Sequence, residues 1–405
     1  MGFSLLPILG AVSPLLVLPV IGRVLGIEGW AAIAVGQSVG LAASAPIYWG
    51  WNVVGPAEIA LADSDRRGQL FRLSLATRGL IALPACAVAA AAAAIIIGGS
   101  YAGIAALMAV AAAVSGLSPT WFYIGVGQPG KIAMFDSLPR LAAALLSVPI
   151  ILVTHSGFVY PALTLALSVI GLVAAARSII SRAGRDPITW PMVGSRFRRQ
   201  GFLAVSALIT TSYTNASVAL VSVAPGQTSV SVGNFAAGTR LIGMAQAGLT
   251  AVVNAFQGWV GRGSPSGEPS SRVIALRTTI GLGVGGGVTL AIFLPPVSSL
   301  IFGAEIRVGE VTAVFLGLAF LLYAATASLT FYVLVPLGST GIISTATIIA
   351  SVVGAPLVIF LAAHFGAAGA ASAIAAAELI VLLIETPVAY RCVSRAGGTT
   401  SSTRG

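Results

Sequence analysis

The sequence predicts an all-α polytopic membrane protein with about twelve transmembrane helices arranged as two six-helix lobes. Only 8% of the 405 residues are charged and 57% are hydrophobic, and the mean hydropathy is +1.00. Apolar runs of about 20 residues recur along the chain, which is the length a helix needs to cross a bilayer. Because a bilayer offers no water to backbone polar groups, each run is expected to be helical.

The predicted spans follow one another with short connections. In chain order they cover roughly residues 3–21, 31–54, 74–98, 101–124, 139–154, 158–180, 201–223, 229–257, 276–301, 310–335, 341–363 and 366–389.

Basic residues alternate between the two sides that these spans define. Eighteen of the 21 Lys and Arg residues lie in the gaps after even-numbered spans, at the span ends that border these gaps, or in the C-terminal tail, whereas only Arg23 and Arg307 fall on the other side. Arg78 is counted with the gap after span 2. The positive-inside rule therefore predicts a multi-pass protein with both termini in the cytoplasm. Nearly all the basic residues are Arg and Ala is abundant, which favours a bacterial chain and hence the bacterial cytoplasmic (inner) membrane.

A basic stretch divides the chain into two sets of six spans. We expect an N-terminal lobe at 1–180, a cytoplasmic basic linker at 181–200, a C-terminal lobe at 201–390 and a cytoplasmic tail at 391–405. The halves look related, because an offset of 202 residues aligns Gly36 with Gly238 and Asn52 with Asn254. Six spans per half predicts parallel repeats about an axis along the membrane normal, with a site between them.

Several chemistries lack their sequence signatures. No Gly-x-x-x-x-Gly-Lys-Ser/Thr pattern predicts an ATP site, and no Ser/His/Asp or paired-carboxylate arrangement predicts an enzyme. The two His and two Cys residues suggest no metal site, so no cofactor is expected. The net charge of +10 is spread over cytoplasmic loops, which favours contact with anionic membrane lipids over nucleic acid. The glycine-rich stretch 281–287 predicts a closely packed helix surface.

Arg240 is the one basic residue that falls deep inside a predicted span. A cation at that depth costs a few kcal/mol or more unless it faces a wet cavity or a partner. A cavity-facing cation for an anionic substrate is our main hypothesis for Arg240. There are two alternatives. Arg240 forms a charge pair with a carboxylate such as Glu378, or its side chain extends along the helix to the outer membrane interface.

Polar residues line one face of spans 2 and 8. In span 2 these include Gln37, Tyr48 and Asn52, and in span 8 Gln246 and Asn254, at matching helical spacings. We predict that they bind substrate, although the aromatic residues around Tyr48 also suit an interface belt. Two charged residues join these candidates. Arg23 either attracts phosphate at the outer mouth or anchors the interface, and Glu378 either couples transport to an ion gradient or pairs with a cation.

Four segments resemble the Wzx-type polysaccharide (O-antigen) flippases of the MOP superfamily, which also contains MurJ and the MATE exporters. They are LPVIGRVLGIEGWAAIAVGQ (18–37), WFYIGVGQPGKIA (121–133), VGNFAAGTRLIGMAQAGLTAVVNAFQGW (232–259) and IFGAE (301–305). The resemblance covers essentially the whole chain. It implies two six-helix lobes around a central, often cationic cavity, with Arg23 and Arg240 at positions where the family often has basic residues.

The resemblance also implies a function. Such a flippase moves an undecaprenyl-diphosphate-linked oligosaccharide from the inner to the outer leaflet by alternating access, for cell-surface polysaccharide such as lipopolysaccharide. Its expected partners are this lipid-linked oligosaccharide, membrane lipids, and a glycan polymerase and glycosyltransferases. The chain departs from the family in having only one clearly buried arginine. A MATE-like cation-coupled drug exporter and a non-transporting membrane scaffold of a glycan-assembly complex are the alternatives.

Overall fold

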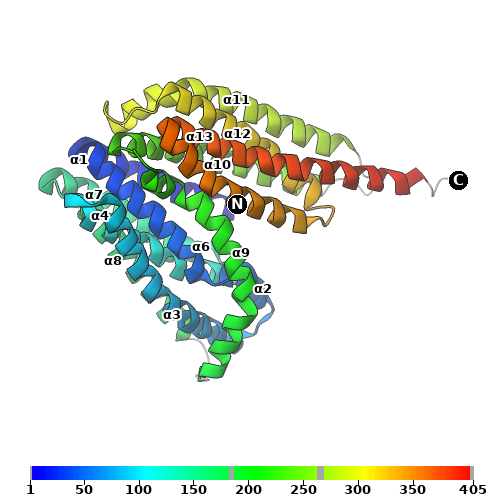
Figure 1. Ribbon diagram of the computed structural model, residues 1–405. Coiled ribbons are helices and arrows are strands. Elements are labelled where there is room, and N and C mark those ends of the chain that lie inside the picture. The colour runs from blue at the N-terminus through cyan, green and yellow to red at the C-terminus, as the bar shows by residue number, and fades with distance from the viewer. Residues whose placement is uncertain (1, 182–186, 262–268, 402–405) are drawn as a thin grey trace. The chain divides into compact units, whose positions relative to one another are not determined.

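The computed structural model describes residues 2–181, 187–261 and 269–401, and within these ranges the chain is helical and contains no strand. The residues form two compact units (Figure 1). Unit 1 covers residues 1–223 and 228–233, and unit 2 covers 224–227 and 234–405. The predicted lobe boundary lay at residues 181–200, before the seventh predicted span, whereas the division in the structure lies after it.

Unit 1 is built from long helices that are interrupted by short irregular turns. Its elements are α1 (Gly2–Tyr48), α2 (Trp51–Leu61), α3 (Ser64–Ile97), η1 (Gly99–Tyr101), α4 (Ala102–Ala113), η2 (Val114–Leu117), α5 (Thr120–Val126), α6 (Pro129–Ile132), the π-helix η3 (Ala133–Ser137), α7 (Leu138–Thr154), α8 (Val159–Ile180) and α9 (Trp190–Val223).

Helix α9 belongs to unit 1 because it packs on α1 and α3. The hydroxyl of Ser38 on α1 donates to the carbonyl oxygen of Asn215 at 2.5 Å and accepts from the amide of Ala219 at 3.2 Å. At the other end of α9, the Trp49 indole donates to the carbonyl oxygen of Phe197 at 3.2 Å. Part of the predicted linker is therefore an ordered helical segment docked on unit 1.

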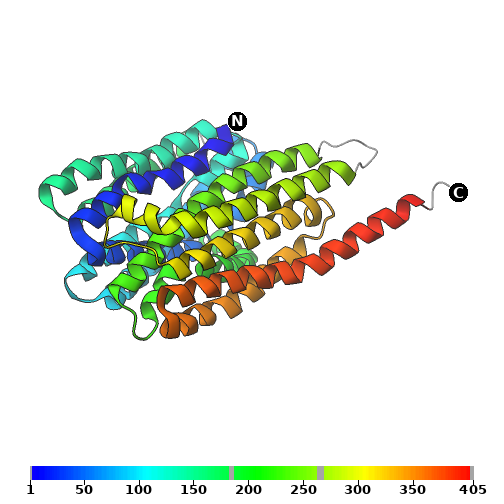
Figure 2. The ribbon, with the colours of Figure 1, turned by 90° about the horizontal axis from the view of Figure 1, so that it is seen from above.

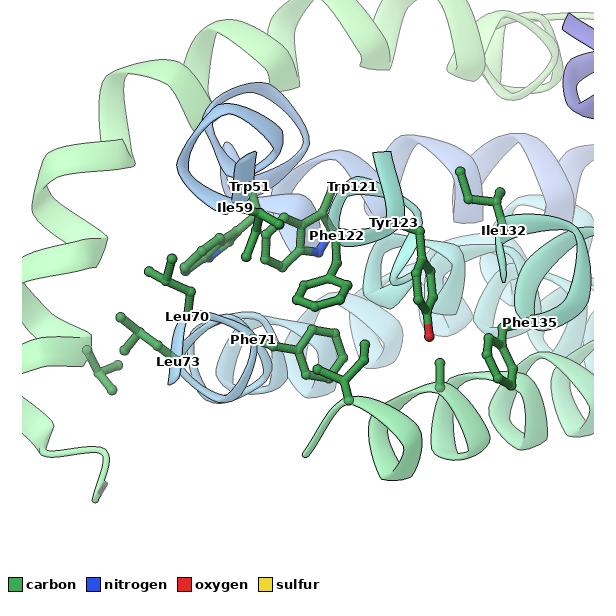
Figure 3. Close-up of a cluster of buried hydrophobic side chains, with 13 residues drawn as sticks. Trp51, Ile59, Leu70, Phe71, Leu73, Trp121, Phe122, Tyr123, Ile132 and Phe135 are labelled. Carbon is green, nitrogen blue, oxygen red and sulfur yellow. The ribbon is translucent and has the colours of Figure 1, made fainter. Parts of the chain in front are cut away.

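Aromatic side chains form the core at one end of unit 1 (Figure 3). Trp51, Phe71, Trp121 and Phe122 are buried, and their rings pack in tilted and edge-to-face pairs with centroids about 5–6 Å apart. Such pairs add stability beyond the apolar area they bury. This core holds α2, α3 and α5 in place around the break between α1 and α2.

Unit 2 contains fewer and longer helices. Its elements are α10 (Ser229–Gly261), α11 (Pro269–Phe302), α12 (Glu310–Leu329), the π-helix η4 (Thr330–Leu334) and α13 (Thr340–Ser401). The glycine-rich stretch of α11 packs closely on α12 as predicted, because a Cβ at Gly287 would lie 2.6 Å from the carbonyl oxygen of Gly317. Gly281 and Gly285 do not contribute to this contact.

Two glycines divide the longest helices into pairs of arms. Gly26 in α1 has φ 67° and Gly366 in α13 has φ 60°, a left-handed conformation that favours glycine. Figure 2 shows the chain of α13 reversing, with the orange arm running back alongside the red one. Each of these helices therefore contains two of the predicted spans, 3–21 with 31–54 and 341–363 with 366–389.

Eight stretches of the described residues are long and apolar enough to cross a membrane. They include one stretch each in α1 and α13, Leu16–Tyr48 and Gly341–Cys392, and they do not include α9 or α10. The predicted number of twelve spans therefore stays a prediction. One predicted boundary was wrong, because span 2 ends at Tyr48 rather than residue 54. The fourth predicted span lies within one candidate span, Gly99–Val126, whose helix is interrupted at Ser118 and Pro119.

Candidate functional site

The polar face predicted for span 2 is interrupted in the structure. Helix α1 ends at Tyr48, and the next two residues, Trp49 (φ 43°) and Gly50 (φ 78°), take left-handed conformations before α2 begins. Asn52 is therefore exposed on a separate helix and does not continue the helix face that carries Gln37. The prediction that these residues share one helix face was wrong for Asn52, because the left-handed turn changes the direction of the chain.

Arg78 on α3 is a buried cation inside unit 1. It was assigned to a cytoplasmic gap by its position in the sequence, but its side chain is fully buried (0% exposed). Its guanidinium donates to the carbonyl oxygens of Ser118 (3.0 Å), Gly116 (3.3 Å) and Ser74 (3.3 Å), and lies 5.6 Å from the ring centroid of Trp121. The assignment of Arg78 to a loop was wrong, because the interrupted end of α4 supplies the carbonyl oxygens that hold a cation inside.

A second set of polar groups lies next to Arg78. Asp136, in the π-helix η3, accepts hydrogen bonds from Ser118 and from Arg140, both at 2.8 Å. A small cavity of about 10 Å³ between these elements is lined in part by Ser115, Asp136 and Arg140. The charges of Arg140, Asp136 and Arg78 act on the half-buried hydroxyl group of Tyr48. One predicted residue, Tyr48, therefore lies in the electrostatic environment of the buried Arg78 and of the partly exposed pair Asp136 and Arg140.

Helix α10 carries the predicted polar face of span 8 without interruption. Gly238 packs against Leu316 of α12, and the Thr250 hydroxyl lies 3.0 Å from the hydroxyl of Tyr323, which is also on α12. Arg240 is half-buried and lies on the side of α10 opposite the buried residues Ile242 and Leu249. The packing of α10 on α12 therefore leaves Arg240 on the other face of the helix.

The other predicted site residues of α10 and α1 differ in exposure and in the side of the helix on which they lie. Asn254 is exposed and lies within about one quarter turn of Arg240 when viewed along the helix axis, whereas Gln246 is half-buried and closer to the packed side. In α1, Arg23 is exposed three residues before the kink at Gly26, and Gln37 is half-buried. Within either helix, these residues can form the polar faces predicted for substrate contact.

Glu378 on α13 is half-buried. A deeper acid lies seven residues further along the same helix. Glu385 is fully buried (0% exposed) and its Oε2 accepts a 2.9 Å hydrogen bond from the Thr330 hydroxyl. Its Oε1 is buried without a hydrogen-bond partner. Glu385 falls near the end of the last predicted span, 366–389, and its complete burial was not predicted from the sequence.

The acids of unit 1 lie mostly at helix ends, as their positions in the sequence suggested. Asp63 caps α3 by accepting from the amide of Arg66 at 2.8 Å, and Glu58 forms an ion pair with Arg196 of α9. Arg196 also lies over the Trp51 ring at 4.3 Å from its centroid. Across the described part of the chain, no group of three or more His, Cys, Asp or Glu residues is placed to hold a metal ion.

No protein-family model and no curated protein sequence matches the chain. Solved structures share its fold. The lipid II flippase MurJ, in an inward closed conformation, has a TM-score of 0.65 at 14% identity and covers 95% of this chain and 85% of its own. The MATE multidrug transporter DinF-BH has a TM-score of 0.61 at 14% identity, covering 96% and 93%. An inward-facing MATE transporter of the MOP superfamily has a TM-score of 0.56 at 13% identity, covering 97% and 96%.

These likenesses extend over nearly the whole chain and establish its fold. The chain has the architecture seen in MATE transporters and in MurJ, and its long apolar helices make it a multi-pass membrane protein. The predicted resemblance to the MOP superfamily is confirmed at the level of fold. The narrower likeness to Wzx-type flippases stays a prediction.

Proposed function

We propose that the protein is a flippase of the bacterial cytoplasmic membrane. Its substrate is an undecaprenyl-diphosphate-linked oligosaccharide, which it moves from the inner to the outer leaflet for the assembly of cell-surface polysaccharide. A diphosphate and many sugar hydroxyls must cross hydrocarbon, and this requires a polar, cationic path that opens to each leaflet in turn. Both termini are expected in the cytoplasm.

The observation that carries this proposal is the sign of the charge available to a substrate. Arg240 is a half-buried cation well inside a helix, on the face that does not pack on α12. In unit 1, Glu58 and Asp136 are engaged by arginines. A cation on this face of α10 favours an anionic substrate such as a diphosphate over a cationic drug.

Arginine has the chemistry that a diphosphate requires. Its planar guanidinium matches two phosphate oxygens at once and stays charged when water is removed, whereas a lysine ammonium is a single point of charge. The amides of Gln37, Gln246 and Asn254 offer donors and acceptors for sugar hydroxyls. Of the proteins that share the fold, MurJ is described as a lipid II flippase, which shows that this architecture can serve a lipid-linked substrate.

The proposal is tested by export of surface glycan in a bacterial host that lacks its own flippase. Arg240→Ala is expected to lose most export, and Arg240→Lys to retain part of it, because charge remains without the two-pronged geometry. Arg307→Ala is the matched control, since Arg307 is an exposed arginine at a helix connection. Membrane abundance of each variant is measured in the same cells, and full export by an abundant Arg240→Ala protein would reject the phosphate role.

A second function, cation-coupled drug export, is favoured by one observation. Unit 2 holds a fully buried carboxylate, Glu385, and an acid of this kind can bind a coupling cation. MATE transporters with this fold are described as multidrug transporters. Efflux of a cationic dye from cells that express the protein, without rescue of glycan export, would favour this function over the flippase.

A further inference from the structure

Glu385 is the buried group of unit 2 whose bonding is incomplete. Its carboxyl group is buried where α13 meets η4, and Ala389, one turn further along α13, packs in an apolar cluster with Val333 and Leu334. One oxygen, Oε2, is satisfied by the Thr330 hydroxyl, and the other, Oε1, has no partner. A buried ionised carboxylate is costly unless it is paired and hydrogen-bonded on both oxygens. Burial of Glu385 as an ionised carboxylate is therefore unfavourable.

Nearby charged groups do not supply the missing partner. The titratable or charged side chains described on the elements around Glu385 are Arg240, Arg272, Arg277, Glu310, Tyr323, Tyr332, Glu378, Tyr390, Arg391 and Cys392, and no hydrogen bond or ion pair joins any of them to it. Arg277 and Arg391 are exposed, and the Tyr332 hydroxyl is engaged with Thr279 at 3.0 Å and the carbonyl oxygen of Val253 at 3.5 Å. Within the described residues, Glu385 is a buried acid without a countercharge.

A second buried oxygen without a partner lies on α12. The hydroxyl of Thr326 is one turn before Thr330 on that helix and is also buried and unpartnered. Thr330 contacts Glu385, and Leu334, four residues later, lies in the same cluster as Ala389, which is four residues after Glu385. The segment formed by α12 and η4 therefore runs parallel to the arm of α13 that follows Gly366. Thr326 therefore lies at the level between Glu378 and Glu385.

Glu378 and Glu385 are seven residues apart, so they lie on one face of α13 about 10 Å apart along the axis. Glu378 is half-buried and Glu385 is fully buried. Glu378 therefore carries the more exposed of the two carboxyl groups. The contact with Thr330 occurs where the helix widens into the π-turn Thr330–Leu334, a feature that is frequent at functional sites.

We propose that Glu385 is a proton-binding site, reached from Glu378 past the hydroxyl of Thr326. A proton added to Oε1 converts the carboxylate to a neutral carboxylic acid, while Oε2 continues to accept from Thr330. Release of that proton restores the buried charge, which favours a rearrangement around the π-turn. A proton suits the site better than a metal ion, because hard cations take six or more oxygen ligands. The role of this site in driving transport rests on the proposed function.

The direct test is infrared difference spectroscopy of the purified protein between acidic and alkaline pH. The wild type is expected to show the C=O band of a buried, protonated carboxylic acid, with the usual shift in D₂O. Glu385→Gln should lose this band, because an amide keeps the shape but cannot be protonated. Glu310→Gln, which removes a highly exposed acid at the start of α12, should keep it. Thr330→Val should shift the band, since it removes the hydrogen bond to Oε2.

Two results would overturn the proposal. One is a band that is identical in the wild type and in Glu385→Gln. The other is a Glu385-dependent band that sodium removes at constant pH, because the site would then take sodium instead of a proton. If Glu385→Gln does not fold, the position of the C=O band in Thr330→Val tests the proposal instead. A band at the wild-type position in Thr330→Val would contradict the proposed site.

The infrared measurement needs no substrate, so it separates this proposal from the proposed function. Wild-type protein that flips no lipid but shows the Glu385-dependent band would refute the flippase and leave the proton site standing. For transport, Glu385→Gln is expected to lose the dependence of export on the proton gradient, whereas Glu310→Gln should keep it. Export by Glu385→Gln that still depends on the gradient would contradict the coupling role.

Discussion

At the scale of single residues, the two arginines Arg78 and Arg240 show what position in a sequence can predict. Arg240 stands out because apolar residues flank it on both sides, and the structure places it half-buried inside α10. Arg78 follows a group of arginines and was counted with them as a loop residue, yet it is sealed inside unit 1. Its burial depends on carbonyl oxygens freed at residues 116–118, some 40 positions away, and no local pattern reports that contact.

Replacement of Arg78 by Met is expected to destabilise unit 1 strongly. The carbonyl oxygens of Gly116 and Ser118 would lose their donor in a buried site, and each such loss costs about 1–3 kcal/mol. The thermal unfolding midpoint of the purified protein in detergent should fall clearly. Arg66→Met, which removes an exposed arginine from the same helix, should leave the midpoint nearly unchanged. Equal midpoints for Arg78→Met and the wild type would show that the buried arginine is not structural.

At the scale of elements, hydropathy located the helices well and their interruptions poorly. The apolar run of span 2 continues to residue 54, so nothing in its hydropathy marks the end of α1 at Tyr48. The glycine at position 50 was the available signal, because helices often end at a glycine in the left-handed conformation. The π-turns of η3 and η4 have no comparable signature, since they depend on packing between helices.

The 202-residue offset gains support from local environments in the two units. Gly36 packs against the backbone of α4 and its counterpart Gly238 against α12, and neither leaves room for a Cβ. Thr77 and Thr279, separated by the same offset, are both fully buried and hydrogen-bonded to an aromatic side chain at 3.0 Å. The threonine pair was not used in the alignment of the sequence. The break after α1 has no equivalent in α10, so Asn52 and Asn254 differ in their local structure, and the internal repeat stays a prediction.

The close contact between α11 and α12 predicts different effects for two neighbouring glycines. Gly287→Ala should destabilise unit 2 by about 1–3 kcal/mol, because its Cβ would lie 2.6 Å from a backbone oxygen of Gly317. Gly285→Ala meets no atom within 4 Å and should be neutral or stabilising by up to about 1 kcal/mol, since alanine favours a helix over glycine. Thermal unfolding in detergent measures both, and a stabilising Gly287→Ala would contradict the packing of these helices.

At the scale of the whole molecule, the fold class and the membrane character follow from composition and from the recurrence of apolar runs. The identity of the substrate-facing surfaces does not follow. A helix surface that faces lipid and one that faces a neighbouring helix are both apolar, so hydropathy cannot distinguish them. The polar faces of α1 and α10 were therefore predicted as patterns, and in unit 1 the charges that act on Tyr48 include one buried arginine, Arg78.

The distribution of basic residues predicts the orientation of the whole chain in the membrane. With Cys86 and Cys392 replaced, a cysteine introduced between residues 223 and 227 should react with an impermeant thiol reagent added outside the cell. A cysteine between residues 264 and 268, a stretch that lies outside the described residues, should react only after the membrane is permeabilised. The reverse pattern would invert the predicted sides and with them the direction of transport.

The most direct measurement of the central claim is lipid flipping by the purified protein. Proteoliposomes would carry a fluorescent undecaprenyl-diphosphate-linked oligosaccharide, and a membrane-impermeant reagent would report how much of it is exposed at the outer surface. We predict that the wild type makes the inner-leaflet pool accessible, that Arg240→Ala does so far more slowly, and that Arg307→Ala behaves like the wild type. Accessibility no faster than in protein-free liposomes, together with transport of a cationic dye by the same preparation, would contradict the flippase.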